Sequence, residues 1–373
     1  MRFLVLGLDV DIGHLSGDSV HLKELAENLT AIGHEVSVIV GASGETEAPS
    51  AGFYYYLKGK RLWSVIREVH LIARAVKPDL IYERRLSPKV GYSVSRLSGV
   101  PYFAEVNGIP EAERSILDGR IYEPSWFQVQ TRRNLLRRAK AVVAVSDSLR
   151  DMLVTSYGLE RSRVHVVPNG VNTELFRPME RSACRHELGL EEDASILGFV
   201  GSLAPWQGVD VLIRTLSELR SARRDVRVLI IGEGPDRHRL EGLVEAEELR
   251  DWVTFTGSVP YRDVPKYIGA FDLAVSLKPP MLPGSPLKVR EFMACARPVI
   301  ASRGTQYDFA IVEESGGGTL VESTNTREIA RTIADLLSDK ARLKEMGARG
   351  HDYALKHCSW RLTAQRVAAA CGG

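Results

Sequence analysis

The chain lacks the features that mark several common classes of protein. Its 373 residues hold only four cysteines, which are widely spaced and form no C-x-x-C pair: Cys184, Cys295, Cys358 and Cys371. This pattern argues against a zinc site or a disulfide framework and suits a reducing compartment. The apolar start, residues 1–8, is too short to span a bilayer and has no small-residue cleavage site. We therefore expect a buried first strand and a cytoplasmic protein.

A strong net charge is also missing. The 49 basic residues nearly balance the 47 acidic ones, which leaves a formal charge of +2. Such a molecule has no strong field to attract nucleic acid or anionic lipid, and we expect no nucleic-acid partner. The basic amphipathic stretch 132–140 could lie on a membrane surface, but a solvated helix face is the more common use of such a pattern.

Familiar catalytic motifs are absent too. The histidines show no H-E-x-x-H or similar spacing, so no catalytic metal is implied. No G-x-S-x-G elbow is present, and Ser146-Asp147-Ser148 is typical of a helix N-cap rather than of a nucleophile. We expect neither a metal site nor a serine nucleophile.

Short apolar β-branched runs alternate with helical patterns along the chain. This alternation predicts an α/β fold with parallel sheets covered by helices on both faces. Strands are expected in the first half at 2–7, 35–40, 79–82, 101–105, 141–145 and 164–167, and in the second half at 195–200, 226–231, 252–256, 272–276, 298–301 and 318–321. The chain length suits two doubly wound, Rossmann-like domains that face each other across a cleft.

The boundary between the domains is expected at the turn Pro168-Asn169-Gly170. We assign residues 1–170 to an N-terminal domain and residues 171–355 to a C-terminal domain. The stretch from about 340 to 370 has a helical pattern. Its end, 356–373, is expected to cross back and pack on the first domain; a helix that completes the second domain is the alternative.

Three strand-to-helix turns of the second half, 201–210, 232–235 and 284–291, contain glycine and should meet at one edge of a sheet. In the last of them, free backbone N–H groups and the helix dipole at Ser285–Leu287 would attract an anion. Glu291 follows about one turn later, where it could accept hydrogen bonds from a ribose. Each turn alone could be a simple turn or cap, but together they predict a site for a nucleotide diphosphate.

Polar residues also end two strands of the first half. Tyr82–Arg85 and Glu105–Gly108 should face the cleft, where charged side chains are more often functional than on a helix surface. We select Arg84 and Asn107 as candidates, with a salt-bridged structural arginine as the alternative for Arg84.

The order of motifs resembles a known family. It comprises Gly17…His21…Leu25…Gly33-His34-Glu35-Val36, Tyr82-x-Arg84, Glu105-Val106-Asn107-Gly108, Val143-x-Val145-Ser146, Val167-Pro168-Asn169-Gly170-Val171-Asn172…Phe176-x-Pro178, Gly201…Gly208-Val209-Asp210, Gly232-x-Gly234-Pro235 and Glu291-x-Met293-Ala294…Pro298-Val299-Ile300-Ala301. In this the chain is similar to the retaining glycosyltransferases of family 4, which have the GT-B fold. The resemblance covers nearly the whole chain in order.

The resemblance implies transfer of a sugar from a nucleotide diphosphate donor, UDP or GDP, to the hydroxyl of a small-molecule or saccharide acceptor. The anomeric configuration would be retained, and neither a metal nor a separate cofactor would be needed. Glu291 would hold the ribose, the N–H groups of Ser285 and Leu287 would bind the diphosphate, and Gly17 would approach it from the opposite domain. Asn107 would stand where many members have a histidine near the sugar.

The chain departs from the family at the donor site. Ser202 and Gln207 replace an arginine and a lysine that neutralise the diphosphate, and Pro283 replaces a glutamate that contacts the sugar. We expect Lys288, helped by Arg303, to supply the missing positive charge. Ala296 stands in place of a usual glycine, which is a smaller change.

The resulting assignment has three groups of residues. The donor site comprises Gly17, Ser202, Gln207, Gly232, Gly234, Ser285, Leu287, Lys288, Glu291 and Arg303; the acceptor site comprises Asp18, Arg84 and Asn107; the catalytic residues are Asn107, Lys288 and Glu105. A front-face reaction is expected, with hinges at 168–178 and 350–360 that close the domains. The alternatives are an inactive glycosyltransferase-like binding protein and a nucleotide-sugar epimerase on the same fold.

Overall fold

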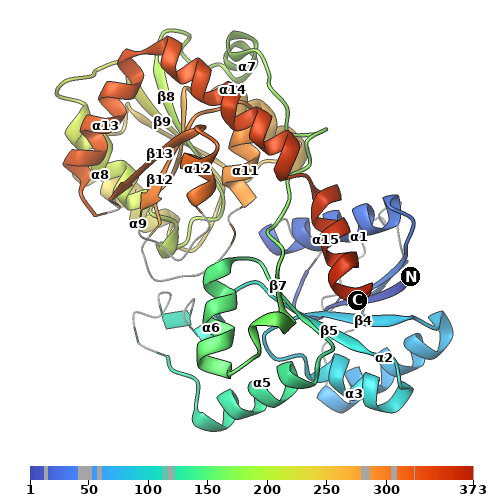
Figure 1. Cartoon of the computed structure of the whole chain (residues 1–373). Coiled ribbons are helices and arrows are strands. Elements are labelled where there is room, and N and C mark those ends of the chain that lie inside the picture. The colour runs from blue at the N-terminus through green and yellow to red at the C-terminus, as the bar shows by residue number, and fades with distance from the viewer. Residues whose placement is uncertain are drawn as a thin grey trace.

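The chain folds into two parallel sheets, each covered by helices, in a computed structural model (Figure 1). The structure describes residues 1–11, 16–40, 53–56, 61–111, 114–115, 120, 122–278, 285, 287–303, 309–322 and 324–372. Within these residues, no helix is long and apolar enough to cross a membrane.

The first sheet has seven parallel strands in the order β3-β2-β1-β4-β5-β6-β7. They are β1 Arg2–Gly7, β2 Glu35–Val40, β3 Phe53–Tyr56, β4 Leu80–Arg84, β5 Tyr102–Val106, β6 Val142–Ala144 and β7 Val164–Val166. The helices are α1 Gly17–Ala31, α2 Leu62–Val76, α3 Lys89–Ser98, α5 Trp126–Arg138 and α6 Asp147–Tyr157. Apolar residues of α2, α3, α5 and α6 share one core with the sheet, and those of α1 share the other.

The second sheet has six parallel strands in the order β10-β9-β8-β11-β12-β13. They are β8 Ser195–Val200, β9 Val226–Ile231, β10 Val253–Gly257, β11 Leu273–Ser276, β12 Val299–Arg303 and β13 Gly318–Glu322. The helices are α7 Arg181–Leu188, α8 Val209–Leu219, α9 Arg237–Ala246, α10 Val264–Gly269, α11 Leu287–Ala294, α12 Ala310–Glu314, α13 Thr326–Ser338 and α14 Lys340–His357.

These elements confirm the predicted α/β fold and every strand expected from the sequence. One strand was missed: β3 pairs only with β2, at the edge of the first sheet. It is four residues long, a run of Phe53 and three tyrosines, with no helical pattern directly before it. Such a short aromatic run carries too little periodicity to be identified as a strand.

The C-terminal segment crosses back to the first sheet, as expected, but as two helices rather than one. α14 ends at His357, and α15, Trp360–Gly372, begins after a break at Cys358–Ser359. At the break Val171 donates its N–H to the carbonyl of Cys358 (2.7 Å), so the crossing is tied to the connection between the domains. α15 then packs beside α1, and the two chain ends lie close together (Figure 1).

Gly170 is required at this crossing. A Cβ atom on it would lie 2.6 Å from the backbone N and Cα of Trp360, which is too close for any side chain. The connection and the crossing helix therefore pack backbone to backbone. The domain division at residue 170 remains a prediction.

Candidate functional site

The glycine turns of the second sheet converge, as the sequence predicts. They follow β9, β8 and β11, which are neighbours in the sheet. A Cβ on Gly232 would lie 1.9 Å from the carbonyl oxygen of Gly201, and one on Gly234 would lie 2.4 Å from that of Leu203. Glycine is needed here because the loops press directly on one another.

Lys288 reaches into this group of loops from the first turn of α11. Its Nζ donates to Oε1 of Gln207 (2.8 Å) and lies 4.0 Å from the centroid of the Phe199 ring. Gln207 in turn donates to Oγ of Ser202 (3.4 Å). Ser202 and Gln207 stand where the family has an arginine and a lysine. They are thus linked to Lys288, which is expected to supply the missing positive charge.

The ammonium group of Lys288 lacks full compensation by negative charge. Burial lowers the pKa of Lys288 well below its usual value, the nearby Lys278 lowers it further, and Glu291 opposes both effects. An anion placed near Lys288 would therefore gain more than the same anion beside an exposed lysine.

Glu291 is buried one turn further along α11. Its Oε1 accepts a hydrogen bond from the hydroxyl of Tyr261 (3.0 Å). Burial raises the pKa of Glu291 to about 7, although Tyr261 and Lys288 act in the opposite direction. The position agrees with the expected role beside a ribose.

Arg303 is not held beside Lys288. It ends β12, and its guanidinium donates to Oε1 of Glu313 on α12 (2.6 Å). Its contribution to the donor site remains a prediction. A second lysine, Lys278, has a stronger case: it is buried two residues after β11 and acts electrostatically on Lys288.

On the facing domain, a polar cluster gathers at the carboxyl ends of β4 and β5. Glu105 is its centre and is buried. Its Oε2 accepts from the hydroxyl of Tyr82 (2.6 Å), and its Oε1 accepts from Nδ2 of Asn107 (2.5 Å). Oε1 also lies 2.8 Å from Nε2 of His21 and 3.6 Å from Nε of Arg84.

This cluster is electrostatically complete. Burial alone would raise the pKa of Glu105, but His21, Arg84 and Tyr82 outweigh it and lower that pKa to about 2. Arg84 also donates to Oδ1 of Asp18 on α1 (2.5 Å). The three predicted acceptor-site residues, Asp18, Arg84 and Asn107, are therefore brought together around Glu105.

A cavity of about 670 Å³ opens beside this cluster. Its walls include all three predicted acceptor-site residues together with Glu105. In the described part of the chain, Oδ1 of Asn107 is buried without a hydrogen-bond partner. Asn107 thus carries an oxygen with unused acceptor capacity beside the cavity.

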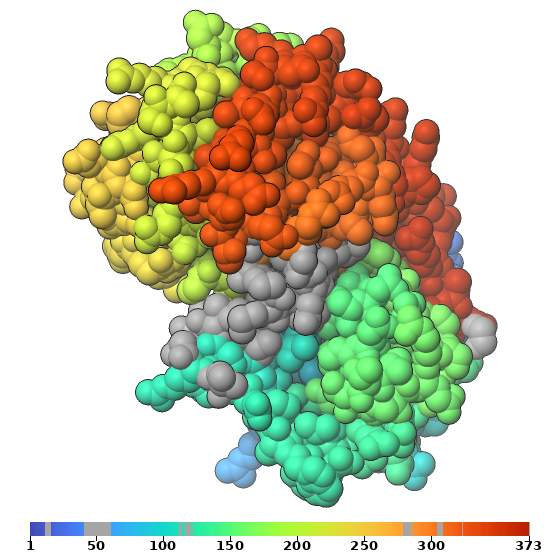
Figure 2. Space-filling model, turned by 60° about the vertical axis from the view of Figure 1, so that its left-hand side comes forward, coloured from blue at the N-terminus to red at the C-terminus, as the bar shows by residue number. Residues whose placement is uncertain are grey.

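The donor and acceptor sides meet where the start of α1 approaches the start of α11. A Cβ on Gly17 would lie 3.6 Å from Cδ1 of Leu287. The backbone N–H and Nδ2 of Asn169 donate to Oγ (3.3 Å) and O (2.9 Å) of Ser285, respectively. Figure 2 shows the second half of the chain, coloured yellow to red, above the first half, coloured teal to green.

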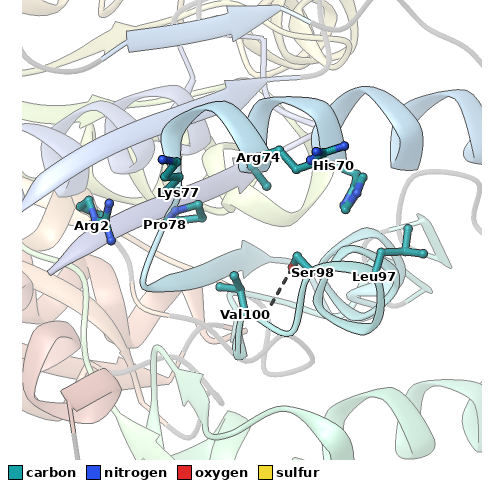
Figure 3. A pocket seen from close by; sticks show the side chains of 9 residues that line it. Arg2, His70, Arg74, Lys77, Pro78, Leu97, Ser98 and Val100 are labelled. Carbon is teal, nitrogen blue, oxygen red and sulfur yellow. Dashed lines mark hydrogen bonds between the residues drawn. The ribbon is translucent and has the colours of Figure 1, made fainter.

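A second cavity, of about 600 Å³, lies elsewhere. Arg2, His70, Arg74, Lys77 and Leu97 are among the residues that line it (Figure 3). It contains no predicted site residue and lies at the amino ends of β1 and β4, opposite the edge where the site is built.

Sequence reasoning missed three residues that the structure places at the site: His21, Asn169 and Lys278. His21 and Asn169 belong to quoted motifs but were given no role. Lys278 could have been found, because it follows a strand at the carboxyl edge, as Arg84 does. Parts of two predicted motifs, residues 12–15 and residues 283, 284 and 286, lie outside the described residues.

No group of three or more His, Cys, Asp or Glu residues in the described ranges could hold a metal ion.

Two family models match the chain in tandem. The model described as Glycosyltransferase Family 4 matches residues 15–175, and that of Glycosyl transferases group 1 matches residues 180–353. The two matches meet near the expected domain boundary.

Named relatives and solved structures agree with this. The chain is 30% identical over 275 residues, 70% of this chain and 71% of the relative, to a GDP-mannose-dependent alpha-(1-6)-phosphatidylinositol monomannoside mannosyltransferase of Mycolicibacterium smegmatis. It is 27% identical to a D-inositol 3-phosphate glycosyltransferase of Segniliparus rotundus, over 96% of this chain and 84% of the relative.

Among solved structures, HepE of Anabaena in complex with UDP-glucose superposes with a TM-score of 0.80 at 21% identity. The match covers 100% of this chain and 99% of that chain. At this identity the likeness shows the fold alone. From the family matches, the relatives and this fold, the chain belongs to glycosyltransferase family 4 and is a glycosyltransferase with the GT-B fold.

Proposed function

We propose that this enzyme transfers a sugar from a nucleoside diphosphate donor to a hydroxyl group held in the cavity beside Glu105, with retention at the anomeric carbon. One observation carries the proposal: the start of α11 faces Gly17 of the other domain and is flanked by Lys288 and Glu291. A helix start favours phosphate, and the carboxylate one turn later suits a ribose.

The donor would lie along α11. Its diphosphate would accept hydrogen bonds from the N–H groups at Ser285 and Leu287 and would pair with Lys288. In the family, two cations neutralise the diphosphate, and this chain lacks both, so the positive charge must come from another residue. The incompletely compensated ammonium of Lys288 supports this placement. Ser202 and Gln207 would hold the ammonium in position rather than bind phosphate directly.

The reaction would need no protein nucleophile. The acceptor oxygen attacks the anomeric carbon on the face from which the phosphate departs, the bond from that carbon to the phosphate oxygen breaks, and the hydroxyl proton passes to the departing phosphate. Lys288 would stabilise the negative charge that develops there. This route requires no metal.

Glu105 is poorly suited to attack or to take the proton. Both its oxygens already accept hydrogen bonds, and its pKa of about 2 makes it a weak base. We therefore assign Glu105 the task of holding Arg84 and Asn107 at the cavity. The free Oδ1 of Asn107 would accept a hydrogen bond from a hydroxyl of the sugar or the acceptor.

The nucleotide base and the sugar of the donor can be identified by experiment. One relative is named for GDP-mannose and one similar structure contains UDP-glucose, so both UDP and GDP are candidates. Thermal unfolding with each nucleotide should show a rise in Tm for the base that binds the native state. Turnover of the matching nucleotide sugars is then measured with and without an acceptor panel.

The outcomes separate the possible activities. Donor consumption that requires an acceptor and yields a glycoside of unchanged anomeric configuration supports the proposal. Isomerisation of the donor without acceptor would identify an epimerase. Failure of both nucleotides to raise Tm at millimolar concentration would contradict the proposed donor site.

A further inference from the structure

A continuous chain of polar contacts links the two sides of the cleft. Nε2 of His21 lies 2.8 Å from Oε1 of Glu105, and Nδ1 of the same ring lies 2.8 Å from Oδ1 of Asn169. Asn169 then donates from its backbone N–H and from Nδ2 to Ser285. The chain runs from the acceptor-side cluster, through the connection between the domains, to the start of α11.

The contact at the Glu105 end is a close approach to a charged group. Tyr82 and Asn107 donate to the two oxygens of Glu105, which is therefore an ionised acceptor. Nε2 of His21 lies 2.8 Å from Oε1, at ion-pair distance, but without the geometry of a hydrogen bond among the described residues. The buried ring therefore packs against the carboxylate and limits where it can lie.

The contact at the other end requires a proton on Nδ1. Nδ2 of Asn169 donates to the carbonyl oxygen of Ser285 at 2.9 Å, so a flipped amide would set two oxygens against each other. The amide oxygen of Asn169 must then be the atom that faces Nδ1, and it accepts a hydrogen bond from that nitrogen. The ring of His21 is buried and lies edge-on to that of Trp360 (centroids 5.2 Å apart).

We propose that His21 and Asn169 are positioning residues that couple the donor side to the acceptor side. This rests on the proposed function. A diphosphate that binds at Ser285 fixes that residue, Asn169 carries the restraint to His21, and His21 sets the position of Glu105. Because Glu105 holds Arg84 and Asn107 at the cavity, the acceptor would be aligned only when the donor side is ordered.

The connection offers a matched control. Asn172 lies three residues after Asn169 and also bridges the domains, through a hydrogen bond from its Nδ2 to Oε1 of Glu24 on α1 (2.9 Å). Among the described residues, Glu24 bonds to Asn28 and Asn172 and makes no hydrogen bond or ion pair with Glu105. Asn172→Ala therefore tests whether the loss of any interdomain hydrogen bond lowers activity, or only the loss of those made by Asn169.

The experiment compares Asn169→Ala, Asn169→Asp, His21→Gln and the double variant His21→Gln/Asn169→Ala with Asn172→Ala, after each is shown to fold by circular dichroism. We expect kcat to fall about tenfold in the first three, as for loss of a buried hydrogen bond. The directly measured Kd for UDP or GDP should change by less than about threefold. The double variant should lose little more than either single variant, since both break one chain.

Asn169→Asp is the most informative variant. It keeps an oxygen facing His21 and the backbone N–H that donates to Oγ of Ser285, but it removes the Nδ2 donor to the carbonyl oxygen of Ser285. The fold and the Nδ1 contact of His21 should survive while kcat still falls. Asn172→Ala should leave kcat within about twofold. Equal loss in Asn172→Ala and Asn169→Ala, or a fully additive double variant, would overturn the coupling.

A spectroscopic readout separates this inference from the proposed function. In ¹⁵N spectra of the ligand-free protein, Nδ1 of His21 should give a protonated signal, with His21→Gln used to assign it. An Nδ1 without a proton would overturn the inference whatever the activity. If Nδ1 is protonated but the protein binds no nucleotide, the proposed function fails; the chain of contacts then stands but couples no ligand sites.

Discussion

The charged groups of the acceptor side and of the donor side are compensated to different extents by their neighbours. On the acceptor side Glu105 is surrounded by donors and its pKa falls to about 2, so its charge is fully compensated. On the donor side the pKa of Lys288 is lowered and that of Glu291 is raised to about 7, so both groups are pushed toward their neutral forms. The comparison indicates that the charge of the acceptor-side cluster is balanced within the folded protein, whereas Lys288 on the donor side has room for the anion that we propose to bind there.

The largest expected effect comes from a substitution in the acceptor-side cluster around Glu105. Glu105→Gln removes the negative charge between His21 and Arg84 and leaves the buried Arg84 with Asp18 as its remaining carboxylate partner, which should lower the free energy of unfolding by about 3 kcal/mol. Urea unfolding at pH 7 measures this. An unchanged midpoint would mean that the cluster is not a compensated charge network.

The same residue predicts a pH effect in the parent protein. The folded pKa of Glu105, about 2, lies below its ordinary value of 4.5, so its stabilisation is present above pH 4.5 and is lost as pH falls toward 2. Acid unfolding of Glu105→Gln should therefore show a smaller loss of stability across that window.

A substitution on the donor side should act on catalysis rather than on stability. Lys288→Ala removes the charge that would meet the departing phosphate, and we expect kcat/KM to fall about 100-fold with little change in Tm. Steady-state kinetics with the cognate nucleotide sugar measure this. Lys266→Ala is the control, because Lys266 is a surface lysine of the same domain paired with Glu187. Parent-like kinetics of Lys288→Ala would remove Lys288 from the mechanism.

A second buried carboxylate sharpens the comparison within the first sheet. Glu83 on β4 is as buried as Glu105 and accepts a hydrogen bond from the N–H of Gly91, near the start of α3 (2.5 Å). Burial dominates here and raises the pKa of Glu83 from 4.5 to about 8. The unfolded chain loses this proton first, so the group lowers stability as pH rises from about 4.5 to 8.

Glu83→Gln should therefore become more stable relative to the parent as pH rises from 5 to 8. Urea unfolding at pH 5, 6.5 and 8 measures the difference. A flat difference would show that Glu83 is ionised in the folded protein. The opposite trends expected for Glu83 and Glu105 would show that donors around a carboxylate, and not burial alone, decide its charge.

The smallest effect concerns the end of α11. Ala296 has a φ of +54°, in the left-handed region that favours glycine, which is why glycine is usual there in the family. Ala296→Gly should raise the free energy of unfolding by about 1 kcal/mol, whereas Ala294→Gly, at the last residue of α11, should lower it by about 1 kcal/mol. Equal signs for the two variants would contradict the strain.

Much of the fold and of the donor loops was predictable from sequence. The strands were found because β-branched runs alternate with helical patterns, and the convergence of Gly201 with Gly232 followed from the shared carboxyl edge of a parallel sheet. The family resemblance predicted that Gly17 approaches the diphosphate from the opposite domain; the structure places Gly17 near Leu287, and its contact with a diphosphate remains a prediction.

The rest depends on contacts between distant residues. His21 and Asn169 are separated by 148 positions, and Asn169 and Ser285 by 116, so no local pattern joins them. The break between α14 and α15 was missed for a related reason: it is set by backbone contacts of Cys358 and Trp360 with Val171, not by a proline or glycine in the helix itself.

The central claim is that a nucleoside diphosphate binds at the start of α11 between the two domains. A crystal structure with the nucleotide that raises Tm, UDP or GDP, tests it most directly. We expect the diphosphate within hydrogen-bond distance of the Leu287 N–H and of Nζ of Lys288, with the ribose hydroxyls on Glu291. Nucleotide bound elsewhere, with this corner of the cleft empty, would contradict the account.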